Sequence, residues 1–277
     1  MKLTANYHTH LALCGHAEGE MEDYIKSAIR SGYTILGISD HGPILTSDLP
    51  KHYYKDFGLD LQMNYDDFKQ VYLPTFHSLK SQYTKQINLF LGLEIEYFPA
   101  IQPYLSKLRK ELDYLILGMH YFPDGDEFYN VYELMNEDLI MKYASITVEA
   151  LNSGLFTVMA HPDIFVYHYK KNNQYVFDEV CEKATRMIVE AAIKNDVFLE
   201  INVGGFHRPR FFDGGIEKYA YPRYDFWKIV TTYKEIKVII GVDAHHPDHL
   251  HHNDIDKAIK FAENLGINVS AYIPKLS

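Results

Sequence analysis

Short apolar runs alternate with longer amphipathic stretches along the whole 277-residue sequence, and this alternation restricts the fold more than any other feature. Runs of strand character cover approximately residues 3–8, 33–39, 88–97, 113–119, 156–160, 197–203 and 238–242. Helical patterns lie at approximately 19–31, 65–84, 101–110, 133–153, 177–195, 222–234 and 253–265. Repeated strand–helix units predict an α/β fold with a parallel sheet, either open or closed into a barrel.

The sequence contains no linker, low-complexity segment or internal repeat that would divide it, so we predict a single domain spanning residues 1–277. Its two cysteines, Cys14 and Cys181, are too few for a disulfide framework. No apolar run has the length of a membrane span, and the amino-terminal residues lack a signal segment. We therefore expect a cytoplasmic protein without a membrane partner.

The formal net charge of −10, without any long basic run, argues against a surface that binds the nucleic-acid backbone. A small-molecule substrate agrees better with this charge than a nucleic acid does. The composition does not indicate an oligomeric state.

The residues at the ends of the predicted strands are suited to metal binding. The first strand ends in His8-Thr9-His10, and side chains two apart in an extended segment point the same way. The carboxyl ends of parallel strands meet at one rim, where β/α barrels carry their active sites. Six of the seven strand ends carry His, Asp or Glu, so we predict a metal site there. The candidate ligands are His8, His10, His16, His41, Glu94, His120, His161, Asp243 and His245.

Imidazole and carboxylate ligands without a cysteine cluster suit zinc, manganese or iron. Nine ligands are too many for one tetrahedral ion, whereas two or three ions that share Glu94 as a bridge would accommodate them. Several divalent ions with only two carboxylate ligands leave a positive centre, which favours an anion such as phosphate. Adjacent ions can hold a hydroxide and stabilise an in-line phosphoryl displacement, so the pattern predicts a hydrolytic phosphoesterase.

The ordered set of motifs resembles the polymerase and histidinol phosphatase (PHP) family, and within it the histidinol-phosphate phosphatases. The resemblance extends over nearly the whole sequence. Its motifs are HTHLALCGHA at 8–17, SDHGP at 39–43, GLEIEYFP at 92–99, GMHYF at 118–122, SGLFTVMAHPDIF at 153–165, LEINVGG at 199–205 and GVDAHHP at 241–247.

This resemblance implies a distorted (β/α)7 barrel of the PHP type that holds three divalent metal ions. Carried over by position, it implies one ion on His8, His10, Glu94 and Asp243, a second on His16, His41 and His245, and a third on Glu94, His120 and His161. The implied reaction is hydrolysis of the phosphate monoester L-histidinol phosphate by a metal-bridging hydroxide, with Glu94 and Asp243 among the catalytic residues.

Family members also use an arginine against the phosphate, and here Arg208 and Arg210 follow the sixth strand. The sequence leaves open which of the two binds it. His207 or a metal-bound water is the candidate proton donor to the leaving alkoxide. The acidic residues Asp40 and Asp163, like Glu96, either face the amine and imidazole of the substrate or orient ligand histidines, and we favour the second role for Asp40.

Three other functions are compatible with parts of this pattern. The first is another PHP phosphoesterase, acting on a sugar phosphate, a nucleotide or phosphotyrosine. The second is a non-catalytic module that binds metal and phosphate, although the intact ligand set argues against it. The third is metal-dependent amidohydrolysis, which typically adds a lysine ligand at a strand end, and no predicted strand end carries one.

Two segments and one cysteine near the predicted site also have expected roles. Residues 42–63 form a long loop that we expect to cap the site or shape substrate entry. In the histidine-rich run 245–252 only His245 is assigned to the metal, and the others to a solvated loop. We expect Cys14 to be a small buried thiol rather than a thiolate ligand.

Overall fold

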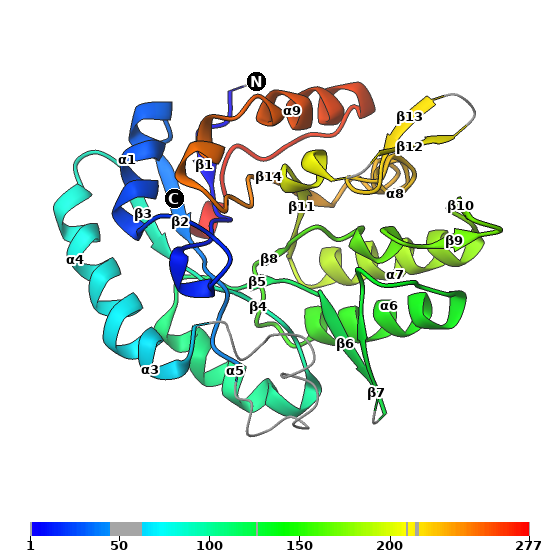
Figure 1. Cartoon of the computed structure of the whole chain (residues 1–277), viewed down its shortest axis with the longest axis horizontal. Coiled ribbons are helices and arrows are strands. Elements are labelled where there is room, and N and C mark those ends of the chain that lie inside the picture. The colour runs from blue at the N-terminus through cyan, green and yellow to red at the C-terminus, as the bar shows by residue number, and fades with distance from the viewer. Residues whose placement is uncertain (1, 45–62, 126, 209, 214–215, 277) are drawn as a thin grey trace.

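Parallel strands form a closed ring at the centre of the protein, and helices surround it (Figure 1). The computed structural model describes residues 2–44, 63–125, 127–208, 210–213 and 216–276. Within these residues the ring consists of seven parallel runs, one of them in two pieces. Its strands are β1 (Ala5–Asn6), β2 (Ile35–Ile38), β3 (Asn88–Leu91), β4 (Glu94–Ile95), β5 (Ile116–Leu117), β8 (Val158–Met159), β11 (Phe198–Asn202) and β14 (Lys237–Gly241).

Two backbone bridges close the ring. One sheet has the order β1-β2-β3 and the other has the order β14-β11-β8-β5-β4. A parallel bridge between His41 and Glu94 joins the sheets on one side, and a second bridge, between Thr9 and Ala244, joins them on the other. The sheet is therefore a barrel, which confirms the closed form of the two that the alternation of elements allowed.

The predicted strand over residues 88–97 is interrupted at Gly92, where it separates into β3 and β4. A Cβ atom on Gly92 would lie 2.3 Å from Cζ of Tyr114, whose ring fills the barrel interior. Only glycine lets the backbone pass this ring without a clash.

The helices follow the predicted ranges closely. Capping residues define several ends, such as the Asp178 side chain that accepts from the backbone N–H groups of Val180 and Cys181. The predicted helix over 65–84 contains one π-helical turn, Phe68–Tyr72, between two α-helical pieces. The α-helices are α1 (Met21–Ser31), α3 (Tyr65–Asp67), α4 (Leu73–Tyr83), α5 (Gln102–Leu108), α6 (Glu137–Asn152), α7 (Glu179–Lys194), α8 (Tyr224–Val230) and α9 (Asp254–Leu265).

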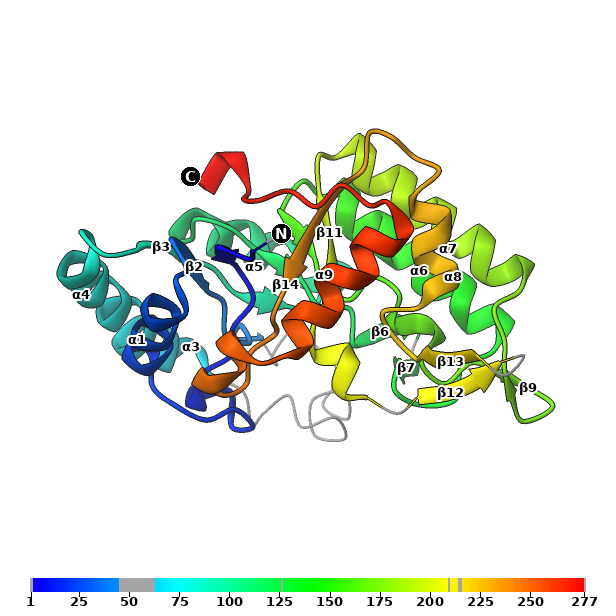
Figure 2. The same cartoon turned by 90° about the horizontal axis from the view of Figure 1, so that it is seen from above.

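Three short antiparallel hairpins were not predicted. They are β6 (Tyr121–Asp124) with β7 (Glu127–Asn130), β9 (Lys170–Lys171) with β10 (Gln174–Tyr175), and β12 (Arg210–Asp213) with β13 (Ile216–Tyr219). Figure 2 shows β6–β7, β12–β13 and β9 at one edge of the molecule. Each hairpin lies in a segment that follows a barrel strand, so the hairpins extend the loops of the barrel.

Side chains of the barrel strands alternate between two buried clusters. Ile116, Val158 and Ile239 belong to a small cluster inside the barrel together with Tyr114. Their neighbours in sequence belong to the large cluster that packs against the helices, as Leu117 does. Because successive side chains of a strand point to opposite faces, this alternation fixes which residues face the interior.

Within the described residues, no helix is both long enough and apolar enough to cross a membrane. Most of the predicted capping loop, residues 45–62, lies outside the described residues.

Candidate metal centre

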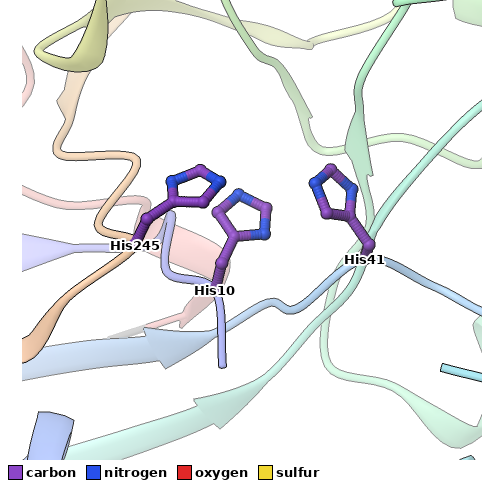
Figure 3. Close-up of side chains that lie close together, drawn as sticks. All are labelled: His10, His41 and His245. Atoms are coloured by element: carbon purple, nitrogen blue, oxygen red, sulfur yellow. The ribbon is translucent and has the colours of Figure 1, made fainter. Parts of the chain in front are cut away.

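The nine candidate ligands meet at the carboxyl-terminal rim of the barrel, as the sequence predicted for parallel strands. The ring centroid of His10 lies 4.2 Å from that of His245 and 4.3 Å from that of His41. In Figure 3 these three side chains come from separate segments and their rings border one space. The His16 ring lies 5.0 Å from His41 and 5.2 Å from His245 between centroids, so it faces the same space.

Glu94 stands at the centre of the site and is 1% exposed. Its Oε2 atom lies 3.4 Å from Nε2 of both His8 and His10. Its Oε1 atom lies 3.1 Å from Nε2 of His161. One carboxylate thus faces two groups of histidines, which is the geometry that a bridging ligand requires.

A glycine makes room for this carboxylate. A Cβ atom at Gly118, two residues before His120, would lie 2.5 Å from Oε1 of Glu94. The LGMH sequence at the end of β5 therefore places the candidate ligand His120 at the rim, and its glycine leaves space for the Glu94 carboxylate of the neighbouring strand β4.

The buried imidazoles fit divalent cations. Nε2 of His8 lies 3.0 Å from Nε2 of His10, and Nε2 of His120 lies 3.1 Å from Nε2 of His161. Imidazole nitrogens that converge in this way beside a buried carboxylate are an arrangement that suits a divalent cation. Three groups made up of the nine candidate ligands alone have donor atoms within 4.8 Å of one another: His8, His10 and Asp243; Glu94, His120 and His161; and His10, His41 and His245. Cys14 and Asp40 form a further such group with His10.

The third of these groups differs from the set that the family resemblance implied. It contains His10, where the resemblance places His16. Nδ1 of His16 lies 3.1 Å from the carbonyl oxygen of Cys14, which orients the ring and leaves Nε2 as its possible ligand atom. The structure thus places His16 beside this group but not among its three members.

Two further carboxylates hold ligand histidines in place. Oε1 of Glu200 lies 2.8 Å from Nδ1 of His8, and Oε1 of Glu96 lies 2.7 Å from Nδ1 of His120. Each contact fixes the ring so that Nε2 faces the centre. For Glu96, this contact favours the orienting role of the two that the sequence left open. Asp40 lies beside the ligands in a similar way, with Oδ1 accepting the backbone N–H of His41 at 2.9 Å and lying 3.6 Å from Nδ1 of His10.

Glu200 was not among the residues singled out from the sequence. The sequence does contain a feature that points to Glu200: a glutamate within the apolar run FLEIN of a fully buried strand needs a polar partner. A Cβ atom at Gly241 would lie 1.7 Å from Oε1 of Glu200, so this glycine makes room for the glutamate. Asn202, on the same strand, donates from Nδ2 to Glu200 at 2.8 Å and to Asp243 at 3.2 Å.

The histidines of the centre differ in pKa according to how close they lie to its carboxylates. Burial opposes protonation of His8, but the charges of Glu200, Asp243 and Glu94 outweigh it and raise the pKa of His8 well above its usual value. Burial lowers the pKa of His41 well below its usual value and that of His245 to about 3. Neutral imidazoles with available lone pairs are the form that binds metal.

Two candidate ligands have unusual backbone conformations. The φ angle is 30° at His161 and 54° at Asp243, a left-handed region that residues with a Cβ atom seldom adopt. Each residue lies two positions after the end of a barrel strand, and this conformation turns the backbone sharply at the rim. Strain of this kind persists where the surrounding structure holds a side chain in one position.

Candidate ligands and Arg208 line a cavity of about 270 Å³ at the centre. The guanidinium carbon of Arg208 lies 5.7 Å from the ring centroid of Tyr132, and its Nε donates to the Tyr221 hydroxyl at 3.3 Å. Arg210 lies in β12 instead, with its guanidinium carbon 5.6 Å from the ring centroid of Tyr219. The structure thus brings Arg208, and not Arg210, into the lining of this cavity.

The remaining predicted residues lie beside the centre or away from it. His207 lines an adjoining cavity of about 400 Å³, and its Nδ1 lies 3.0 Å from Oδ2 of Asp254. Oδ2 of Asp163 accepts hydrogen bonds from the backbone N–H of Arg223 and from Nε1 of Trp227, and Asp163 is not in the lining of the cavity. Burial raises the pKa of the Cys14 thiol to about 12, which agrees with a buried thiol.

Residues 6–204 match the family described as PHP domain, which is most of the chain. This chain belongs to the PHP domain family. The family assignment made from the motifs is therefore confirmed.

Several PHP relatives resemble the chain over most of its length. A Deinococcus radiodurans protein named "Probable histidinol-phosphatase" is 26% identical over 247 residues, which is 87% of this chain and 85% of that protein. The Bacillus subtilis protein named "Histidinol-phosphatase" is 22% identical over 260 residues, 86% of this chain and 92% of that protein.

A solved structure confirms the fold of this PHP chain. Histidinol phosphate phosphatase from Lactococcus lactis, in complex with zinc, L-histidinol and phosphate, superimposes with a TM-score of 0.69 at 17% sequence identity. The match covers 96% of this chain and 95% of that one. The predicted distorted (β/α)7 barrel is thus the observed architecture.

Proposed function

We propose that this PHP protein is a metal-dependent phosphomonoesterase that hydrolyses L-histidinol phosphate to L-histidinol and inorganic phosphate. The observation that carries the proposal is the cavity of about 270 Å³, which imidazoles, carboxylates and Arg208 line together. The choice of substrate rests on the relatives that are named histidinol phosphatases.

The ligand sets of the proposal use the observed geometry. Three divalent ions, of zinc, manganese or iron, would share the nine side chains at the rim. Glu94 would bridge two of them, because its Oε2 faces His8 and His10 while its Oε1 faces His161. When bound, divalent ions lower the pKa of water and neutralise the charge on phosphate oxygens during displacement.

The chain's own residues would position the phosphate. The Arg208 guanidinium presents several N–H donors in one plane, which matches two oxygens of a phosphate group. Its cation–π contact with Tyr132 and its hydrogen bond to Tyr221 hold that plane beside the cavity. Tyr132 in turn stacks on the ligand His120, with ring centroids 6.0 Å apart, so the arginine and the centre are positioned together.

A substrate panel tests the proposal. Phosphate release would be measured with manganese- or zinc-loaded protein on L-histidinol phosphate, p-nitrophenyl phosphate, several sugar phosphates, a nucleotide and a phosphotyrosine peptide. We expect a strong preference for L-histidinol phosphate that is lost on chelation and restored by adding metal. Turnover of another ester instead would contradict the substrate but keep the metal phosphoesterase. Phosphate binding without any turnover would favour the non-catalytic module.

A further inference from the structure

The histidine-rich segment after β14 forms a second cluster with residues that follow β11, outside the centre described above. Its members are His207, His252 and Asp254, whose donor atoms lie within 4.8 Å of one another. Oδ2 of Asp254 lies 3.0 Å from Nδ1 of His207 and 3.3 Å from Nδ1 of His252. These separations are close to those between neighbouring ligands of one tetrahedral ion.

We propose that His207, His252 and Asp254 bind a further divalent transition-metal ion, of the zinc class, beside the cavity of about 400 Å³ that adjoins the metal centre. Two imidazoles and one carboxylate form a ligand set that zinc, cobalt, nickel and copper bind readily, whereas magnesium and calcium prefer oxygen ligands alone. Water would complete the coordination, because the His207 and His252 side chains are 42% and 47% exposed.

Neighbouring residues fix the orientation of the Asp254 carboxylate. The Asp254 side chain is 4% exposed, and its Oδ1 atom pairs with Lys257. Oδ2 is therefore the atom that faces the two imidazoles. Nδ1 of His252 lies 3.3 Å from this oxygen and 3.3 Å from the backbone nitrogen of Asp254. The two imidazoles and the carboxylate oxygen therefore converge on one place, as the three ligands of a single ion would.

Packing keeps His207 above the carboxylate. The preceding residue, Phe206, is buried, and its ring lies 6.2 Å from that of Phe261 on α9, between centroids. Asp254 is the first residue of the same helix. The segment after β11 is thus fixed on the helix that carries the carboxylate, which makes the cluster a property of the fold.

The neighbouring His249 does not complete the set. Its ring stacks on His207 with centroids 6.0 Å apart, but its donor atoms are not among those that lie within 4.8 Å of one another in this cluster. Its Nδ1 accepts the backbone N–H of His245 at 3.2 Å instead. His246 and His251 pair instead with Asp248, which is 67% exposed, and serve as comparison residues in the same run.

Metal counting tests the proposed site in the full chain. Zinc bound per chain would be measured by elemental analysis after equilibration in a zinc buffer, for the unchanged protein, His207→Ala/His252→Ala and the matched control His246→Ala/His251→Ala. We expect the first double variant to bind one ion fewer, and the control to bind the same number as the unchanged protein. Both changes are at exposed side chains, and a far-ultraviolet circular dichroism spectrum checks that the variants fold.

Cobalt gives a second readout that does not depend on turnover. Titration with Co²⁺ should produce ligand-field bands that the His207→Ala/His252→Ala variant lacks in part and the control retains. Equal metal content and equal cobalt spectra in all three proteins would overturn the proposal and leave the cluster as an ion-pair network between two segments. Because the experiment counts ions, its outcome is independent of whether L-histidinol phosphate is the substrate.

Discussion

Arg208 and Arg210 are two residues apart but contact different groups. This difference is why we propose Arg208 as the residue that binds phosphate. Arg208 lines the cavity at the centre, whereas Arg210 lies over Tyr219 in β12. We predict that Arg208→Ala lowers kcat/KM by about 100-fold, because a donor to the charged oxygens is lost. Arg210→Ala, which removes the same charge from the same segment, should change it by less than about 3-fold. Equal losses in steady-state kinetics would contradict the assignment.

Glu200 acts on the centre through His8, since its Oε1 lies 2.8 Å from Nδ1 of that ring. Glu200→Gln keeps the shape of the side chain but removes its charge. We predict a loss of metal affinity of about 10- to 100-fold, as is usual for partners that orient a ligand histidine. Competition with a chelator of known affinity measures it. Glu182→Gln, on the exposed face of α7, is the control and should leave the affinity unchanged.

At the scale of single elements, capping side chains define where helices begin. Asp178 caps α7 through the backbone N–H groups of Val180 and Cys181. Burial opposes ionisation of this carboxyl, but hydrogen bonds from Lys171 and Tyr169 outweigh it and lower the pKa from 3.8 to about 2. A folded-state pKa below the unfolded value means that the ionised carboxylate stabilises the folded protein.

We therefore predict that Asp178→Ala lowers the free energy of unfolding by about 1 kcal/mol at neutral pH. The contribution is fully present above pH 3.8 and decreases as the pH falls towards about 2, so the two proteins should converge in acid. Asp178→Asn keeps an oxygen acceptor for the helix and should lose less. Denaturant unfolding at several pH values measures all three proteins. A difference that is independent of pH would argue against the ionised cap.

Most of the structure that the sequence did not predict lies in the loops between the barrel strands and the helices. The hairpins β6–β7 and β12–β13 are only four residues a strand, and they follow barrel strands in segments without clear periodicity. Tyr132, which follows β7, nevertheless contacts Arg208 through a cation–π interaction. Short antiparallel pairs are fixed by their packing on the barrel, so local sequence predicts them poorly.

At the scale of the whole molecule, the ligands join distant parts of the chain, from His8 after β1 to His245 after β14. Divalent ions that bind only the folded barrel should stabilise it, by about 4 kcal/mol when their concentration is about 1,000 times the dissociation constant. We predict that chelation lowers the thermal midpoint and that adding zinc or manganese restores it. Chelator already saturated with zinc is the control, and an unchanged midpoint would argue against metal ligation.

We propose that residues 1–277 form one cooperative domain, although the family match ends at residue 204. The parallel bridge between Thr9 and Ala244 makes the last strand part of the same barrel as the first. Trp227, the single tryptophan, is buried in α8 beyond the matched region. Its fluorescence and far-ultraviolet circular dichroism should therefore report the same unfolding transition. Two separate transitions would show that the carboxyl-terminal part unfolds independently.

The sequence by itself determined the order of strands and helices and the rim at which the nine candidate ligands meet. Both follow from local rules, because periodicity predicts each element and parallel strands bring their carboxyl ends to one side. Only the tertiary structure decided that Glu200 holds His8, that Arg208 rather than Arg210 lines the cavity, and that His207 meets Asp254. These contacts join residues far apart in the chain, so their geometry depends on how loops pack against the finished barrel and on the space that glycines such as Gly241 leave.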